Sequence, residues 1–360
     1  MSRPRAAPSP PAARGPRPGR RAEHALLLAC ARPALDPAQA ACVRRLAAGP
    51  LDWERLLALA GRHRLVPFLH RHLSDAPLPP SARAALRLEA RAEAHRGLLL
   101  AAELRRLLAA LESAGVQALA YKGPALAMRA YGDLSLRSFI DLDLLVRPAD
   151  VPRAIQCLAA AGYAPALALS PAQERWFRRV DGDYPLVHRE TGLLVELHAR
   201  VSSERFCMPI STEALMRRST TMPLGGGEVR TLGDEDLLLV LCVHGAKHRW
   251  KRLEWVAALA ALLRAGRGDA RAARVLAAEL HARRTLLLGL SLARRLLDAP
   301  LPAEVEAEID ADAGLAALAA EAEARLFGGV AEDGDETTAN LHFNLRARDG
   351  VVDRARYAAR

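Results

Sequence analysis

The sequence predicts a small α/β unit between two helical regions, and three observations carry this prediction. The 360 residues are 51% apolar but only 4% aromatic, and the apolar half is mostly Ala and Leu, which favours helices. Residues 23–115 and 231–330 repeat apolar side chains at the three- and four-residue spacing of helices. Residues 116–230 instead hold short β-compatible runs separated by Gly and Pro, which is typical of a small mixed sheet with helices.

The helical region before the core divides at a proline-rich break. Apolar residues recur at helical spacing through residues 51–73, and SDAPLPPS then interrupts the pattern. A long helix resumes after the break and is expected to end at Gly115.

Within residues 116–230, strands and helices alternate. VQALAY at 116–121 and IDLDLLV at 140–146 predict strands, with a short helix between them. VPRAIQCLAAAGY at 151–163 predicts the next helix, and YPLVHRETGLLVELHARV at 184–201 predicts two strands around a Glu-Thr-Gly turn. Residues 232–266 then predict one or two helices with Asp234 as the N-cap, and further helices follow to about residue 327.

The two ends of the chain differ in composition from the rest. Residues 1–22 carry six arginines, six prolines and no acidic residue, so we expect a disordered arm. The arm leaves about +4 of the net charge of +10 for the rest of the chain. It serves either as a solubilising tail or to attract RNA or another phosphate-bearing partner. Residues 331–360 are polar and are expected to form a partly ordered tail.

Apolar runs and cysteines indicate the compartment. No apolar run approaches the roughly 18 residues that cross a bilayer, so no membrane partner is expected. The five cysteines are scattered and are not spaced as zinc ligands, which predicts a reducing, cytoplasmic location.

Two aspartates lie in the second predicted strand. Residues two apart on a strand point to the same face, so Asp141 and Asp143 present their carboxylates together. Such like charges repel unless a cation lies between them, and Mg²⁺ (or Mn²⁺) prefers oxygen ligands of this kind. Placement of the pair at the surface or in a turn is the alternative.

Glu196 and His198 share one face of a later predicted strand. Glu196 is either an ordinary edge-strand charge or a third carboxylate. In the second case it would complete a metal site or accept the proton of an acceptor hydroxyl.

The turn Lys122-Gly123-Pro124 opens the short helix. Pro suits the first helical position, and the free N–H groups of a helix N-terminus attract anions. Lys122 adds a compact positive charge suited to phosphate. Arg137 would add a bidentate phosphate contact, or is simply a solvated arginine.

The only other lysines fall in one later segment with two histidines. His244, Lys247, His248 and Lys251 have the spacing of one helical stripe. Zinc is disfavoured because Gly245 stands where His-Glu-x-x-His needs glutamate. The stripe is either a polar outer face or a basic wall that faces a nucleotide or its acceptor.

The order of these motifs resembles the uncharacterised bacterial nucleotidyltransferase-like proteins of the polymerase β-type superfamily. The resemblance rests on Lys122-Gly123, Arg137, Asp141-Leu-Asp143, Gly162-Tyr163 and Glu196-Leu-His198. Asp52-Trp53-Glu54 and the segment 244–250 also resemble that family, so the likeness extends from about residue 50 to 265. The Lys-Gly-Pro turn departs from the Gly-Ser or Gly-Gly of the superfamily and is similar to the Lys-Gly-Gly of abortive-infection toxins.

The resemblance implies a polymerase β-like core flanked by helices and a Mg²⁺-dependent transfer of a nucleotide from an NTP with release of pyrophosphate. Asp141, Asp143 and Glu196 would hold metal, and Glu196 would also be the candidate base. Lys122, Gly123 and Arg137 would hold the triphosphate. The acceptor stays open between a small molecule, RNA and protein. A catalytically inactive nucleotide-binding partner protein and a toxin-like enzyme acting on RNA are the alternatives.

Overall fold

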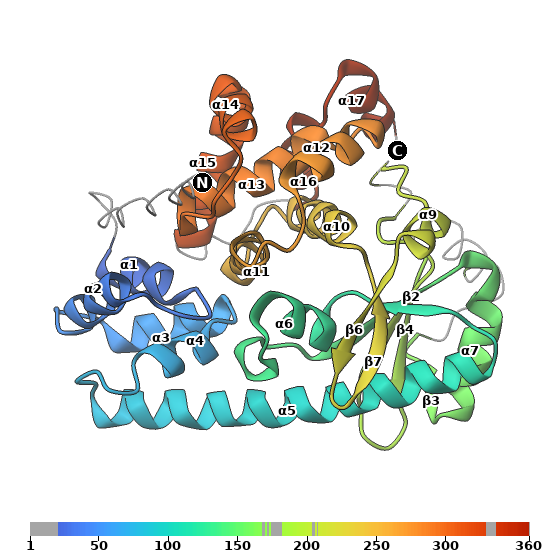
Figure 1. Ribbon diagram of the computed structural model, residues 1–360, viewed down its shortest axis with the longest axis horizontal. Coiled ribbons are helices and arrows are strands. Elements are labelled where there is room, and N and C mark those ends of the chain that lie inside the picture. The colour runs from blue at the N-terminus through green and yellow to red at the C-terminus, as the bar shows by residue number, and fades with distance from the viewer. Residues whose placement is uncertain are drawn as a thin grey trace, which may run out of the picture.

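The computed structural model describes residues 21–167, 182–203, 208–328 and 336–359, together with Ser170, Gln173 and Phe206. The predicted arm at residues 1–22 lies almost entirely outside these described residues. In Figure 1 the N-terminal helices lie beside the sheet, the C-terminal helices lie above both, and α6 lies between them.

Within the described chain, five helices precede the sheet. They are α1 Ala22–Cys30, α2 Pro37–Ala47, α3 Trp53–Arg62, α4 Val66–His72 and α5 Pro80–Ser113. Helix α5 starts at the proline-rich break because Pro80 suits a first helical position. It ends before Gly115, which has a left-handed φ of 73°, as predicted.

A five-stranded mixed sheet forms the middle of the chain, in the order β1-β2-β5-β4-β3. Its strands are β1 Ala118–Ala120, β2 Asp141–Val146, β3 Tyr163–Pro165, β4 Asp183–His188 and β5 Leu194–His198. Strands β2 and β5 run parallel, and the other neighbours are antiparallel. The intervening helices are α6 Gly123–Tyr131, η1 Leu134–Leu136, η2 Pro148–Asp150 and α7 Val151–Ala160. The predicted strands, the short helix and the Glu-Thr-Gly hairpin are confirmed.

A second hairpin follows the sheet and was not predicted. After α9 Thr212–Arg217, strands β6 Thr220–Leu224 and β7 Gly227–Thr231 pair across Gly225 and Gly226, both with left-handed φ. The Gly-Gly-Gly run is the local signal for this turn.

The remaining described chain is helical. The helices are α10 Asp234–Lys247, α11 Leu253–Arg264, α12 Ala270–Glu279, α13 Arg283–Leu297, α14 Ala303–Ala311, α15 Ala313–Phe327, α16 Glu336–Arg346 and α17 Val351–Ala358. The predicted N-cap of α10 is wrong by one residue, because Gly233 occupies it. Asp234 is instead drawn into an ion pair with Arg129 of α6. Helices α16 and α17 fall in the predicted tail, and Arg348 between them is buried against the Phe206 and Tyr357 rings.

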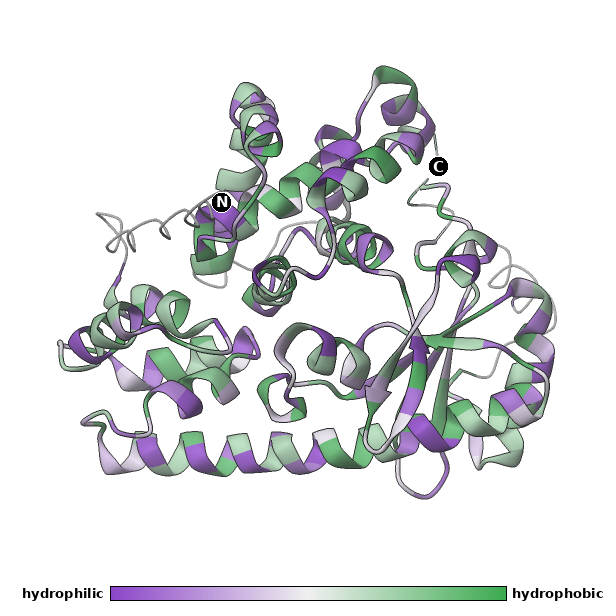
Figure 2. Ribbon diagram, in the orientation of Figure 1, coloured by the Kyte–Doolittle hydropathy of each residue, from purple (hydrophilic) through white to green (hydrophobic). Residues whose placement is uncertain are grey.

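Two hydrophobic clusters hold these elements together. The first joins α1–α4 with α10, α11, α13 and α15, and the second lies between the sheet and the C-terminal half of α5. Helix α5 contributes Leu86 to the first cluster and Leu100, Leu104, Leu107 and Leu111 to the second. Figure 2 shows hydrophilic and hydrophobic residues alternating along α5, as on a helix with one exposed face. No helix of the described ranges is both long and apolar enough to span a membrane.

His63 connects three helices beside the sheet. Its Nδ1 accepts a hydrogen bond from the Leu253 N–H at 3.2 Å, so Nε2 carries the proton and donates to the Leu326 carbonyl at 3.0 Å. The ring is fully buried. Burial, followed by the charge of Arg62, lowers the pKa of His63 to about 4. The ring is therefore neutral near pH 7.

This pKa predicts acid-sensitive stability. An unfolded His63 takes up a proton near its ordinary pKa of 6.5, whereas the folded ring resists protonation down to about pH 4. The folded state therefore loses stability as pH falls through this window, by about 2 kcal/mol from His63 between pH 7 and pH 5. We expect His63→Gln to reduce that pH-dependent difference in urea unfolding. His95→Gln, which changes an exposed ring on α5, should leave it unchanged.

Candidate active site

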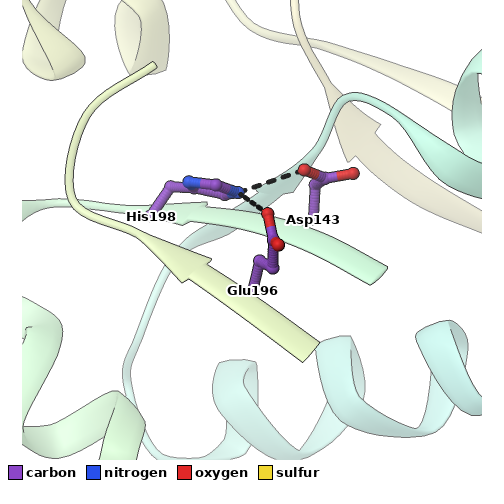
Figure 3. Close-up of side chains that lie close together, drawn as sticks. All are labelled: Asp143, Glu196 and His198. Atoms are coloured by element: carbon purple, nitrogen blue, oxygen red, sulfur yellow. Dashed lines mark hydrogen bonds and ion pairs between the residues drawn. The ribbon is translucent and has the colours of Figure 1, made fainter. Parts of the chain in front are cut away.

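Two neighbouring parallel strands bring the predicted carboxylates together. In the register of β2 and β5, Asp143 lies opposite Glu196, Asp141 opposite Leu194, and Leu145 opposite His198. Figure 3 shows Asp143, Glu196 and His198 directed toward one another from these two strands. The sequence predicted that Asp141 and Asp143 share one face of their strand and that Glu196 and His198 share one face of theirs. The pairing of β2 with β5 brings these two faces together at one site.

Asp143 is the most enclosed group of the site, with 4% of its side chain exposed. Its Oδ1 accepts hydrogen bonds from Lys122 Nζ at 2.8 Å and from His198 Nε2 at 3.1 Å. His198 Nδ1 donates in turn to Asp183 Oδ1 at 2.7 Å. His198 therefore lies between two carboxylates and donates to both of them.

These contacts raise the pKa of His198 and lower that of Asp143. Burial disfavours a charged His198, but its hydrogen bonds to Asp143 and Asp183 outweigh burial and raise its pKa to about 9. Burial alone would raise the pKa of Asp143, yet Lys122 and the hydrogen-bonded His198 hold it far below its usual range. His198 is therefore protonated and Asp143 ionised at neutral pH.

Asp141 and Glu196 shift in the opposite direction. Burial, and then the charge of Asp143, raise the pKa of each of these two carboxyls. The Glu196 side chain is 36% exposed and forms an ion pair with His198 Nε2 at 3.5 Å. One firmly ionised carboxylate beside two more basic ones is a pattern found where acid–base chemistry occurs.

The donor set fits a hard divalent cation. Ligand atoms of Asp143, Glu196 and His198 all lie within 4.8 Å of one another. Asp141 is not part of that close group, although the pKa values show that its charge and that of Asp143 affect each other. Protonated His198 has no lone pair for a metal, so the oxygen atoms are the fitting ligands, and carboxylates suit Mg²⁺ or Mn²⁺.

The Lys122-Gly123 turn borders this carboxylate group. Lys122 is the N-cap of α6 and makes no capping bond with its side chain, which extends to Asp143 instead. Gly123 has a left-handed φ of 50°, and an added Cβ would lie 3.3 Å from the Asp141 carbonyl oxygen. The turn therefore requires glycine, and its backbone lies directly against the start of β2.

Arg137 is buried beneath this turn. Its Nη2 pairs with Glu254 Oε1 at 2.8 Å, and its Nη1 donates to the Gly123 carbonyl at 3.4 Å. Only 7% of the Arg137 side chain and 1% of that of Glu254 are exposed. In this conformation the Arg137 guanidinium supports the Lys122-Gly123 turn from the side of Glu254. Lys122 is the cation on the side of the turn that faces the carboxylates.

The prediction that His244, Lys247, His248 and Lys251 lie on one helical stripe is wrong for Lys251. Helix α10 ends at Lys247, and Arg249 and Trp250 take left-handed φ values of 50° and 54°, so Lys251 lies beyond the helix. The reason is tertiary, because the fully buried Trp250 ring folds back onto Gly245. The Trp250 N–H then bonds the Gly245 carbonyl at 2.7 Å and closes the helix end.

The histidines of this helix end form an aromatic group with Trp255, with ring centroids 4.9–5.6 Å apart. Burial, and then the charge of Lys247, lower the pKa of His248 to about 3. Burial, and then Lys122, hold the pKa of His244 well below its usual range. Both rings are therefore neutral, and the effect of Lys122 on them places this end of α10 beside the α6 turn.

Sequence reasoning missed three residues near the carboxylate site, namely Asp183, Arg64 and Arg252. Asp183 lies opposite His198 in the β4–β5 register, so hairpin pairing could have identified it. Arg64, just after α3, and Arg252, just before α11, have no local signal. They come together because the neighbouring His63 bonds the Leu253 N–H, although the two bonded residues are 190 positions apart in the chain.

Comparison with known proteins agrees with this geometry. A family model described as "Uncharacterised nucleotidyltransferase" matches residues 49–298. No curated protein and no solved structure matches the chain. The matched span contains the five-stranded mixed sheet, the carboxylate group and the α6 turn, in agreement with a polymerase β-like α/β core flanked by helices. On this match the chain belongs to the uncharacterised nucleotidyltransferase family.

Proposed function

We propose that this protein transfers a nucleoside monophosphate from an NTP to an acceptor and releases pyrophosphate. The observation that carries the proposal is the pairing of Asp143 with Glu196 across β2 and β5, beside the Lys122-Gly123 helix turn. Carboxylates on adjacent strands next to a helix N-terminus provide a metal site beside an anion site.

Asp141, Asp143 and Glu196 would hold the metal. Both described hydrogen bonds of Asp143 go to Oδ1, and Figure 3 shows its second oxygen directed away from His198. Mg²⁺ or Mn²⁺ bound there would neutralise charge on the triphosphate and polarise its α-phosphoryl group. Lys122 and protonated His198 keep the Asp143 carboxylate ionised and fixed in orientation.

Glu196 is the candidate general base. Its raised pKa makes it a better proton acceptor than Asp143, and its partial exposure leaves room for an acceptor hydroxyl. The acceptor oxygen bonds to the α-phosphorus while the bond from that phosphorus to the bridging oxygen of pyrophosphate breaks. The hydroxyl proton passes to Glu196.

The phosphates would lie at the N-terminus of α6. The Gly123 and Ala125 N–H groups and the Lys122 ammonium would provide donors there, and Arg137 supports the turn from beneath. Lys247 and neutral His248 would contact the nucleotide or acceptor from the end of α10, with His244 and Lys251 as accessory groups. The acceptor is a small molecule, RNA or a protein hydroxyl.

Label transfer tests the proposal. We would incubate the protein with each α-³²P-labelled NTP, Mg²⁺ or Mn²⁺ and a cell extract, beside Asp141→Ala. We expect labelled product and pyrophosphate from the wild type, and at least about 100-fold less from the variant. Equal labelling by both proteins would contradict the catalytic assignment. NTP binding without pyrophosphate release would favour the inactive partner protein, and labelled RNA would favour the toxin-like enzyme.

A further inference from the structure

Three arginines from separate parts of the chain converge on the Asp141 side of the site. Arg137 lies under the α6 turn, Arg64 follows α3, and Arg252 is the N-cap of α11. Arg64 Nη1 donates to the Ser138 carbonyl at 3.5 Å, just before β2. The bond between His63 and the Leu253 N–H holds Arg64 and Arg252 next to each other. Helices α6 and α11 pack together, and Arg137 connects their first turns by contacting both the Gly123 carbonyl and Glu254.

The two carboxylates whose charges act on Arg252 are already engaged by other groups. Glu254 is taken by Arg137, and Asp141 belongs to the proposed metal group. Arg64 and Arg252 are half-buried, and neither forms an ion pair with a carboxylate in the part of the chain that the structure describes. Burial, and then the charge of Arg64, lower the pKa of Arg252, as expected when two guanidinium groups are held close together.

The backbone at Arg64 adds a second argument. Arg64 has a φ of 56° at the end of α3, where its N–H bonds the Gly61 carbonyl and the Leu65 N–H bonds the Ala60 carbonyl. This helix ending favours glycine, and a longer side chain costs about 1 kcal/mol there. Arg252 is also held in place, with its guanidinium 5.9 Å from the Trp255 ring centroid. The two arginines are therefore held close together, one of them on a strained backbone, and among the described residues neither forms an ion pair with a carboxylate.

We propose that Arg64 and Arg252 bind the β- and γ-phosphates of the nucleoside triphosphate. The proposal rests on the proposed function for the identity of the ligand. The α-phosphate lies at the Asp141–Asp143 group, and the rest of the triphosphate passes the α6 turn and reaches the two arginines. These residues lie outside the α/β core, so the helical regions before and after it complete the substrate site. Their paired guanidinium groups match phosphate oxygens bidentately.

Equilibrium binding tests the inference without requiring turnover. The proteins are the wild type, Arg64→Gln, Arg252→Gln and the double variant, with Arg87→Gln on the exposed face of α5 as the matched control. The probes are the four NTPs, their NMPs and inorganic tripolyphosphate, each with Mg²⁺. We expect each single variant to raise the Kd of the preferred NTP about 10-fold and to change the Kd of its NMP less than about 2-fold. Tripolyphosphate should compete with NTP in the wild type and lose this competition in the double variant. Circular dichroism confirms that each variant is folded.

Each result has one reading. Unchanged NTP affinity in the double variant, or equal weakening of NTP and NMP, overturns the inference. Weaker binding of a 5′-phosphorylated RNA oligonucleotide with unchanged NTP affinity would assign the arginines to the acceptor and also overturns it. No binding of tripolyphosphate by the wild type overturns it as well. If NTP binding weakens as expected but the wild type transfers no label, the proposed function fails and the inference stands.

Discussion

Asp143→Asn is expected to abolish nucleotide transfer and also destabilise the fold, whereas Glu196→Gln is expected to abolish transfer alone. The Asp143 carboxylate compensates Lys122 and protonated His198 in a buried setting, so its loss leaves two cations without their shared partner. Breaking a buried pair costs about 3–5 kcal/mol. Loss of a general base or a metal ligand lowers the rate by about 100- to 10,000-fold. Label transfer and urea unfolding measure the two effects.

The contrast between the two carboxylates is the control. Glu196 is partly exposed and touches His198 only at 3.5 Å, so its neutral isostere should change the free energy of unfolding by less than about 1 kcal/mol. A fully active Glu196→Gln protein would remove Glu196 from the chemistry. An Asp143→Asn protein as stable as the wild type would show that the buried charges compensate in another way.

Gly245→Ala is expected to destabilise the fold by about 2–3 kcal/mol. An added Cβ would lie 2.6 Å from the Trp250 ring, which is fully buried and cannot move without disturbing its packing. Displacement of Trp250 would also shift the segment from His248 to Arg252. We therefore expect weaker NTP binding in addition to the lower midpoint of urea unfolding.

Gly61→Ala is the matched control for that substitution. Gly61 is helical in α3, and nothing lies within 4 Å of the position of its added Cβ. Alanine should therefore stabilise the protein by about 0.5–1 kcal/mol through its better helix propensity. A destabilising effect of the same size at both positions would mean that Trp250 packing does not explain the Gly245 result.

The parts of the site that the sequence predicts are those with local periodicity. The spacing of Asp141 and Asp143, the Lys-Gly-Pro turn and the Glu-Thr-Gly hairpin each depend on a few neighbouring residues. The pairing of β2 with β5 was not predicted, because parallel neighbours are not set by a turn, and the family resemblance implied only that the three carboxylates share a metal site. Even so, it decides that Asp143 rather than Asp141 lies closest to Glu196.

The parts that local patterns could not predict depend on burial of distant residues. The end of α10 follows from the packing of Trp250, which overrides a helical pattern that continues to Lys251. The placement of Arg64 beside Arg252 follows from one buried histidine bond across the chain. From the sequence Arg137 was either a phosphate ligand or a solvated arginine, and no local signal links it to its buried partner Glu254. Tertiary contacts of this kind have no periodicity in the sequence.

Helix α5 determines how the protein is expected to unfold. This helix contributes apolar side chains to both hydrophobic clusters. Unfolding of one cluster is therefore expected to release part of α5 and so to destabilise the other cluster. The two halves should therefore melt in one cooperative transition, with a calorimetric enthalpy equal to the van't Hoff value. The candidate site, built from both halves, would then be lost in a single step together with the fold.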